Sequence, residues 1–283
     1  MNDFRLCAFT DEAGDALSQQ ILAMKDNAIS CMEIRSVDGR NISDLSIDEA
    51  KRIHDELSAE GLSVWSVGSP IGKISLQDDF AQHLDKLKHT IELAQTLEAS
   101  RMRIFSFYLN GAKPEDCRTQ VLDNLAQFVQ VAEGSGVTLC LENEKGIYGD
   151  IPERALELHH TYAALKAVFD PANFVQCGVD PYQAWQLLAP YVDYMHIKDS
   201  LEDGSIVPPG EGIGKIPELL PLYHAAGGRV LTLEPHLWEF TSLQSLENGG
   251  ETSKIGNFAR TQREAFDLAV NKLKELVASM ERP

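Results

Sequence analysis

Short apolar runs alternate with longer amphipathic segments along the whole chain. The short runs have the length and composition of buried strands. They predict eight strands, at residues 5–9, 31–34, 63–67, 101–105, 137–141, 167–169, 191–197 and 230–233.

The longer segments carry apolar residues at helical spacing. In the third of them, Phe80, Leu84, Leu87 and Ile91 fall on one face, as in an amphipathic helix. Helices are predicted at residues 16–27, 46–59, 78–97, 114–132, 152–160, 181–188, 216–226 and 257–279. Proline near several predicted starts and glycine after several predicted ends support these boundaries.

Eight strand–helix pairs in 283 residues predict an α/β fold, a single (β/α)₈ TIM barrel that forms one domain over residues 1–283. An open doubly wound sheet is the alternative. The turn at residues 10–14 lacks the glycine-rich nucleotide motif that often follows the first strand of that fold. Residues 237–254 form the longest irregular stretch and are a candidate lid or oligomer contact.

Charge and composition narrow the class of partner. The formal net charge of -18 disfavours nucleic acid, and no apolar stretch is long enough to span a membrane. Five scattered cysteines show neither a disulfide framework nor a zinc-thiolate spacing. We therefore expect a cytoplasmic protein whose partner is a small molecule.

A group that can bind a metal ion follows or ends each of the last four predicted strands: Glu142, Asp170, His196 and Glu234. In a parallel barrel these strand ends lie on one rim, where barrel enzymes place their active sites. Three carboxylates and one imidazole suit Mn²⁺, Mg²⁺ or Zn²⁺. Each residue alone has a structural explanation, and Asp170, just before Pro171, can simply cap a helix. The four together predict a metal site.

Several motifs resemble those of the sugar phosphate isomerase/epimerase superfamily, the xylose isomerase-like TIM barrels. This group includes ketose 3-epimerases, hydroxypyruvate isomerase and inosose dehydratase. The motifs are Leu-Glu-Asn at 141–143, Phe-Asp-Pro-Ala-Asn at 169–173, His-Ile-Lys-Asp at 196–199, Pro-Gly-Glu-Gly at 209–212 and Leu-Glu-Pro-His at 233–236.

The resemblance implies one divalent metal ion, Mn, Zn, Mg or Co with Mn or Zn favoured, held by Glu142, Asp170, His196 and Glu234. It also implies an isomerase or epimerase that acts on a ketose or related polyhydroxy carbonyl compound through a metal-stabilised enediolate. Glu142 and Glu234 then double as the acid/base groups. Family members often form homodimers or homotetramers.

Other residues near the predicted rim are candidates for substrate binding or for orienting the ligands: Glu33, Lys73, Glu144, Asn173, Lys198, Asp199 and His236. Among them, Asp199 is expected to orient His196, and Glu33 to face the barrel mouth or pair with Arg35. Glu144 departs from better-known members, several of which have histidine there. No phosphate cradle is evident, which favours a non-phosphorylated substrate.

Three alternatives stay open. A lyase, either an inosose-type dehydratase or a keto-glycoside-cleaving enzyme, begins with the same proton abstraction. An endonuclease IV-like repair enzyme shares the barrel but needs many more histidine ligands, and six of the eight histidines here fall in predicted helices. A non-catalytic sugar-binding barrel predicts damaged ligands, whereas all four are present.

Overall fold

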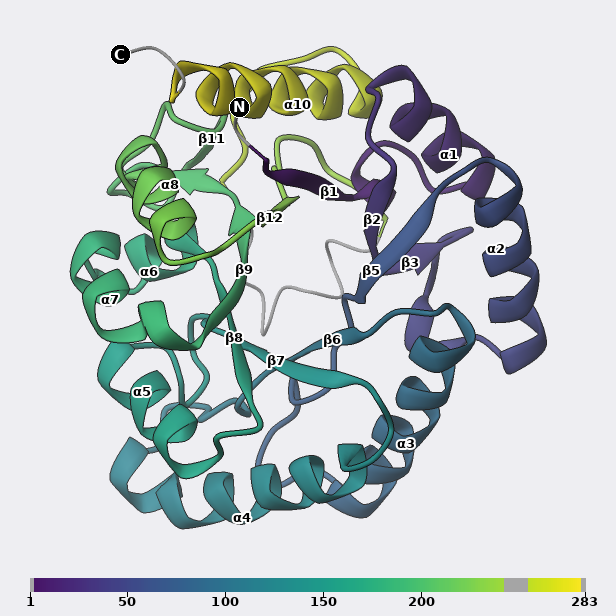
Figure 1. Ribbon diagram of the computed structural model, residues 1–283. Helices are drawn as coiled ribbons and strands as arrows, with labels where there is room; N and C mark the ends of the chain where they lie inside the picture. The colour runs from purple at the N-terminus through teal and green to yellow at the C-terminus, as the bar shows by residue number, and fades with distance from the viewer. Residues whose placement is uncertain (1–2, 242–253, 281–283) are drawn as a thin grey trace.

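A computed structural model describes residues 3–241 and 254–280. Eight parallel strands close into a barrel in the order β1-β12-β9-β8-β7-β6-β5-β2, and the helices surround it (Figure 1). The strands are β1 Arg5–Phe9, β2 Cys31–Ile34, β5 Ser63–Val67, β6 Arg101–Ile104, β7 Thr138–Glu142, β8 Lys166–Phe169, β9 Val192–Ile197 and β12 Val230–Leu233. The prediction of a (β/α)₈ barrel is confirmed.

The two ends of the chain meet where the barrel closes. Strand β12 pairs in parallel with β9 on one side and with β1 on the other. The final helix, α10 (Gln262–Ser279), lies outside the barrel beside β1 (Figure 1). The closing strand therefore joins the first and last parts of the fold.

The outer helices begin and end with the expected local chemistry. They are α1 Leu17–Asp26, α2 Ile47–Ala59, α3 Phe80–Thr96, α4 Pro114–Ala132, α5 Pro152–Thr161, α6 Pro171–Gln176, α7 Pro181–Leu188 and α8 Ile216–Ala225. Ser46 and Glu49 form a capping box at the start of α2, and Pro114 occupies the first turn of α4. Gly61 and Gly134 follow their helices at positive φ, which glycine adopts without strain.

The interior of the barrel is layered because strand side chains alternate between two faces. Cys31, Cys140, Val168 and Tyr194 pack together in a buried cluster inside the fold. Each precedes by two residues a polar group of the candidate site: Glu33, Glu142, Asp170 and His196. An apolar layer thus lies beneath the polar rim, and the cysteines of this layer are buried core residues.

The predicted boundaries differ from the observed ones in a few places. Helix α6 was not predicted, because its six residues are too few to show helical periodicity. The last helix starts at Gln262 rather than 257. Most of the predicted lid or oligomer contact, residues 242–253, lies outside the described residues. No helix within the described ranges has the length and apolar character needed to cross a membrane.

Candidate metal centre

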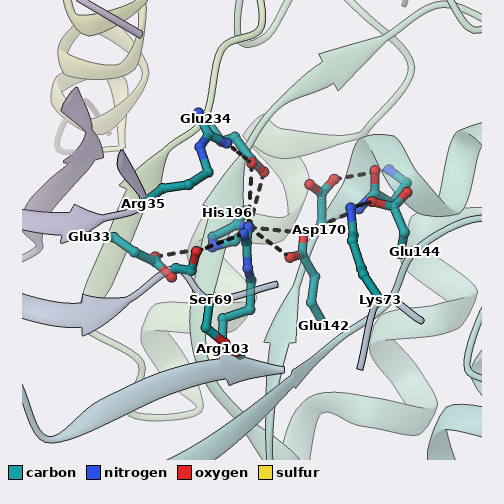
Figure 2. Close-up of polar contacts among 12 residues, drawn as sticks. Glu33, Arg35, Ser69, Lys73, Arg103, Glu142, Glu144, Asp170, His196 and Glu234 are labelled. Atoms are coloured by element: carbon teal, nitrogen blue, oxygen red, sulfur yellow. Dashed lines mark hydrogen bonds and ion pairs between the residues drawn. The ribbon is translucent and has the colours of Figure 1, made fainter. Parts of the chain in front are cut away.

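Four successive strands bring the four predicted ligands to one point at the rim. Glu142 ends β7, Asp170 follows β8, His196 lies in β9 and Glu234 follows β12. One ligand atom from each lies within 4.8 Å of the others, and all four residues are buried. Figure 2 shows their side chains converging from different strands.

The imidazole of His196 lies at the middle of the cluster. Its Nδ1 is 3.1 Å from Oε1 of Glu142 and 3.2 Å from Oε2 of Glu234, whereas its Nε2 is 3.1 Å from Oε2 of Glu33. Burial alone would lower the pKa of His196, but the three carboxylates outweigh it and raise the pKa well above its usual range. The cluster therefore favours a positive charge at Nδ1.

The donors present fit a divalent cation. Oε2 of Glu142 and Oδ2 of Asp170 are buried, and among the described residues their contacts with Arg103 and Lys198 are ion pairs without hydrogen-bond geometry. Buried carboxylates repel one another and need a compensating cation. Carboxylate oxygens with one imidazole nitrogen are a ligand set suited to Zn²⁺, Mn²⁺ or Mg²⁺. Glu142, Asp170, His196 and Glu234 can accordingly hold one such ion.

Asp170 fills two roles at once. Its Oδ1 accepts a hydrogen bond from the backbone N–H of Asn173 at 2.9 Å, which caps α6, and its Oδ2 faces the cluster. The side chain of Asn143 holds the backbone of Asp170 on both sides, at 2.8 and 2.9 Å. Asn173 also donates to Oε1 of Glu142 at 3.2 Å. Asp170 can therefore cap α6 with one oxygen and bind a metal ion with the other.

Lys198 reaches the same cluster. Its Nζ lies 2.8 Å from Oδ2 of Asp170 and 3.4 Å from Oε2 of Glu234. Burial raises the pKa of Asp170 to about 7, with the charge of Lys198 opposing and those of Glu142 and Glu234 adding to the rise. In Glu234, Lys198 and His196 outweigh burial and hold the pKa well below its usual range.

Two buried arginines hold the glutamate oxygens that point away from His196. Nη1 of Arg35 lies 2.9 Å from Oε1 of Glu234, and Nη1 of Arg103 lies 3.2 Å from Oε2 of Glu142. The guanidinium of Arg35 lies over Phe9 and Phe240, and that of Arg103 lies over Phe9 and Phe105. Each glutamate thus keeps one oxygen for the cluster while a guanidinium holds the other.

A second acidic group, formed by Glu12, Glu234 and His236, lies beside the first. Arg35 already contacts two of its members, with Nη2 3.2 Å from Oε1 of Glu12 and Nη1 on Glu234. Burial raises the pKa of Glu12 to about 8 and lowers that of His236 to about 4. Because a guanidinium supplies the positive charge there, the group does not require a metal ion.

Lys73 and Glu144 form an ion pair at the rim. Nζ of Lys73 lies 3.0 Å from Oε2 of Glu144 and 4.5 Å from the centre of the Phe105 ring. Lys73 and Lys198 outweigh the effect of burial and lower the pKa of Glu144. Figure 2 shows this pair beside Asp170, at the edge of the cluster.

The expectation that Asp199 orients His196 is wrong, and the carboxylate that contacts Nε2 of His196 is that of Glu33. Both oxygens of Asp199 accept backbone N–H groups, from Ser200 at 3.0 Å and from Gly210, Gly212 and Gly214 at 2.9, 3.0 and 2.9 Å. A Cβ on Gly212 would lie 2.2 Å from Oδ1 of Asp199, so the loop needs glycine there. Asp199 therefore organises residues 208–215. Nor does Glu33 pair with Arg35, which binds Asp11, Glu12 and Glu234.

Sequence reasoning missed three residues of this cluster: Arg103, Glu12 and Asn143. The sequence does contain an indication for Arg103, because it is a charged residue two positions after Arg101 in an otherwise apolar predicted strand. Alternation places it on the inner face of β6, where a charge needs a partner. Glu12 and Asn143 lie in short turns whose direction the sequence does not give.

Comparisons with known proteins agree with this fold. Solved structures similar to this chain include IolI protein with a bound zinc atom (TM-score 0.75, 17% identity, covering 97% of this chain and 98% of that one). They also include L-ribulose 3-epimerase (0.73, 18%, 100% of both chains). A third is the probable 3-DHS dehydratase AsbF from Bacillus anthracis, involved in petrobactin synthesis (0.72, 17%, 98% of both).

Sequence comparison identifies the family directly. No curated protein matches the chain. Residues 21–248 match the profile of the family described as xylose isomerase-like TIM barrel, and this span includes all four strands that supply the candidate ligands. The chain belongs to the xylose isomerase-like TIM barrel family.

Proposed function

We propose that this protein is a divalent-metal-dependent isomerase or epimerase that acts on a ketose or a related polyhydroxy carbonyl compound. The observation that carries the proposal is the convergence of Glu142, Asp170, His196 and Glu234, buried within 4.8 Å of one another at the rim of the barrel. Similar folds include L-ribulose 3-epimerase and the zinc-bound IolI protein, which supports both the reaction class and the metal.

The two glutamates are the proposed acid/base pair. Glu142 and Glu234 approach His196 from different strands, and a guanidinium fixes one oxygen of each. One carboxylate removes the proton from the carbon next to the carbonyl. The other returns a proton to the opposite face, which gives the epimer, or to the adjacent carbon, which gives the isomer. A divalent cation at this site would supply Lewis-acid stabilisation of the negative charge that develops on the substrate oxygens.

An uncharged substrate fits the charges at the rim. Each of four cationic side chains there already has a carboxylate oxygen within 3.2 Å: Arg35, Lys73, Arg103 and Lys198. A phosphate or carboxylate on the substrate would have to displace one of these carboxylates. Hydroxyl groups can instead share the existing donors and acceptors. We therefore favour a non-phosphorylated ketose, inosose or keto-glycoside.

A lyase on the same site is the second candidate, and the position of Lys198 favours it. After proton abstraction, a lyase must protonate a departing oxygen, and an ammonium 2.8 Å from Asp170 and 3.4 Å from Glu234 is a donor within the cluster. The fold of the probable 3-DHS dehydratase AsbF is also similar.

Metal content tests the centre. Plasma mass spectrometry should find about one divalent ion per chain in the wild type and a loss of that ion in Glu234→Ala and His196→Ala. Glu56→Ala, which removes a carboxylate from α2, is the matched control and should bind metal normally. A wild type that binds no ion after incubation with excess Mn²⁺ or Zn²⁺ would overturn the proposal.

Isotope exchange then tests the reaction. With a panel of ketoses, inososes and keto-glycosides in D₂O, NMR should show deuterium entering a carbon next to the carbonyl as the epimer or isomer forms. Glu142→Gln should abolish this exchange. A product that has lost water or an alcohol would establish the lyase in its place.

A further inference from the structure

Glu33 contacts His196 from across the barrel. It lies in β2, which is not a neighbour of β9 in the barrel order, yet its Oε2 is 3.1 Å from Nε2 of His196. Glu33, Tyr194, Ser66 and His196 are all completely buried. Figure 2 shows Glu33 on the side of the imidazole opposite Glu142 and Glu234.

The other oxygen of Glu33 is held by hydroxyl donors. Tyr194 donates to Oε1 at 2.8 Å, and Ser66 Oγ lies 3.2 Å from the same oxygen and 3.1 Å from the Tyr194 hydroxyl. A carboxylate that receives these donors serves as an acceptor. The Nε2 of His196 is therefore the donor to Oε2, and Nδ1 is the nitrogen that faces Glu142 and Glu234.

Packing fixes the plane of the same ring. Phe9 meets the imidazole edge-on at 5.2 Å with an interplanar angle of 76°, and Tyr194 meets it at 5.6 Å and 62°. A 180° flip of the ring within this plane would place a carbon in the position of Nε2 and so lose the contact with Glu33. The surroundings thus select one nitrogen for the cluster.

We propose that Glu33 is the positioning residue of the metal centre: its carboxylate holds Nε2–H of His196 and so presents Nδ1 to the cation. Metal-binding histidines commonly donate their second N–H to a carboxylate, which sets the tautomer and increases the basicity of the ligating nitrogen. This inference rests on the proposed function, because it needs the metal centre to exist. Tyr194 and Ser66 extend the arrangement by holding the carboxylate in place.

Zinc affinity, measured by competition with a chromophoric chelator, tests the proposal without any substrate. Glu33→Gln should bind Zn²⁺ about 10–100-fold more weakly than the wild type. Tyr194→Phe should weaken binding by a smaller factor. Asp193→Asn is the matched control: it alters an acidic residue at the opposite end of β9, where Asp193 pairs with Arg101, and it should leave the affinity unchanged.

The state of the imidazole provides a second readout. In the zinc-loaded wild type with ¹⁵N-labelled histidine, NMR should show a slowly exchanging proton on Nε2 of His196 and none on Nδ1. The same proton should exchange faster in Tyr194→Phe, which keeps the carboxylate and removes its donor. If Glu33→Gln does not fold, the exchange rate of the Nε2 proton in Tyr194→Phe tests the positioning role of Glu33.

His196→Ala separates the two possible failures. If it loses zinc while Glu33→Gln and Tyr194→Phe both bind as tightly as the wild type, the metal centre stands and the positioning role of Glu33 is wrong. If His196→Ala itself binds zinc normally, the centre and the proposed function fail together.

Discussion

Nη1 of Arg103 lies 3.2 Å from Oε2 of Glu142, the oxygen of that glutamate that does not face His196. Both side chains are almost fully buried, and Nε of Arg103 has no hydrogen-bond partner among the described residues. The guanidinium therefore compensates negative charge inside the barrel instead of forming a surface ion pair. Removing it should leave a buried carboxylate without its cation.

We predict that Arg103→Met destabilises the metal-free protein by about 3–5 kcal/mol, the range typical when one partner of a buried ion pair is removed. Urea unfolding of the chelator-treated protein measures this change. Arg118→Met, which breaks an exposed pair with Glu157, should have a much smaller effect. An equally small effect of Arg103→Met would mean that water already solvates Glu142.

Lys198→Met should separate metal binding from turnover. The substitution removes a cation next to Asp170 and Glu234 but removes no ligand, so the metal content should stay at the wild-type level. Under the proposed function, turnover should fall by about 100-fold or more if Lys198 transfers a proton to or from the substrate. Parallel metal analysis and steady-state assays measure both. A loss of metal equal to that of His196→Ala would instead show that Lys198 mainly holds Asp170 in position.

Asp199→Asn should destabilise the fold and leave the metal centre intact. Each oxygen of Asp199 accepts two backbone N–H groups, so an asparagine NH₂ in either orientation would face two donors. Unpaired buried donors cost about 1–3 kcal/mol each, and a loss of about 2 kcal/mol or more is expected. Denaturant unfolding measures the loss, and hydrogen exchange should speed up at Gly210, Gly212 and Gly214. A selective loss of metal without destabilisation would contradict this assignment.

A buried histidine should make stability fall with acid. Burial lowers the pKa of His83 to about 4, and its Nε2 accepts the backbone N–H of Gly72 at 2.8 Å. In the unfolded chain His83 is protonated below about pH 6.5. In the folded chain it stays neutral until about pH 4. The free energy of unfolding therefore decreases as the pH falls through this window, by on the order of 2 kcal/mol for this group.

The variant His83→Gln keeps an acceptor for Gly72 and cannot titrate. Urea unfolding at pH 7, 6 and 5 should show a smaller decrease in stability for this variant than for the wild type. His160→Gln, at an exposed position in α5, is the control and should keep the wild-type pH dependence. Identical pH profiles for His83→Gln and the wild type would show that folding does not lower the pKa of His83.

The sequence predicted the convergence of Glu142, Asp170, His196 and Glu234 for a physical reason. Parallel strands end at one rim, so a polar group at the end of each apolar run is automatically brought to the others. It could not predict Glu33 as the partner of His196, because that contact crosses the barrel between strands that are not neighbours and lie 163 residues apart. Such a contact depends on the diameter and tilt of the closed barrel.

The incorrect expectation that Asp199 orients His196 arose for a different reason. Side chains alternate along a strand, so Lys198 shares a face with His196, whereas Asp199 points the other way. Nearness in sequence suggested a contact that this alternation forbids. The same rule, applied strictly, would have favoured Lys198 over Asp199 and would have drawn attention to Arg103.

The position of Glu234 has a consequence for folding. Glu142, Asp170 and His196 belong to three adjacent strands, but Glu234 follows β12, the strand that must pair with β1 for the barrel to close. A partly folded chain with an open seam between β1 and β12 lacks the fixed fourth ligand and the arginine that holds it. The ion would therefore bind the closed barrel more tightly than such an intermediate, so its uptake should slow unfolding and should report completion of the seam during refolding.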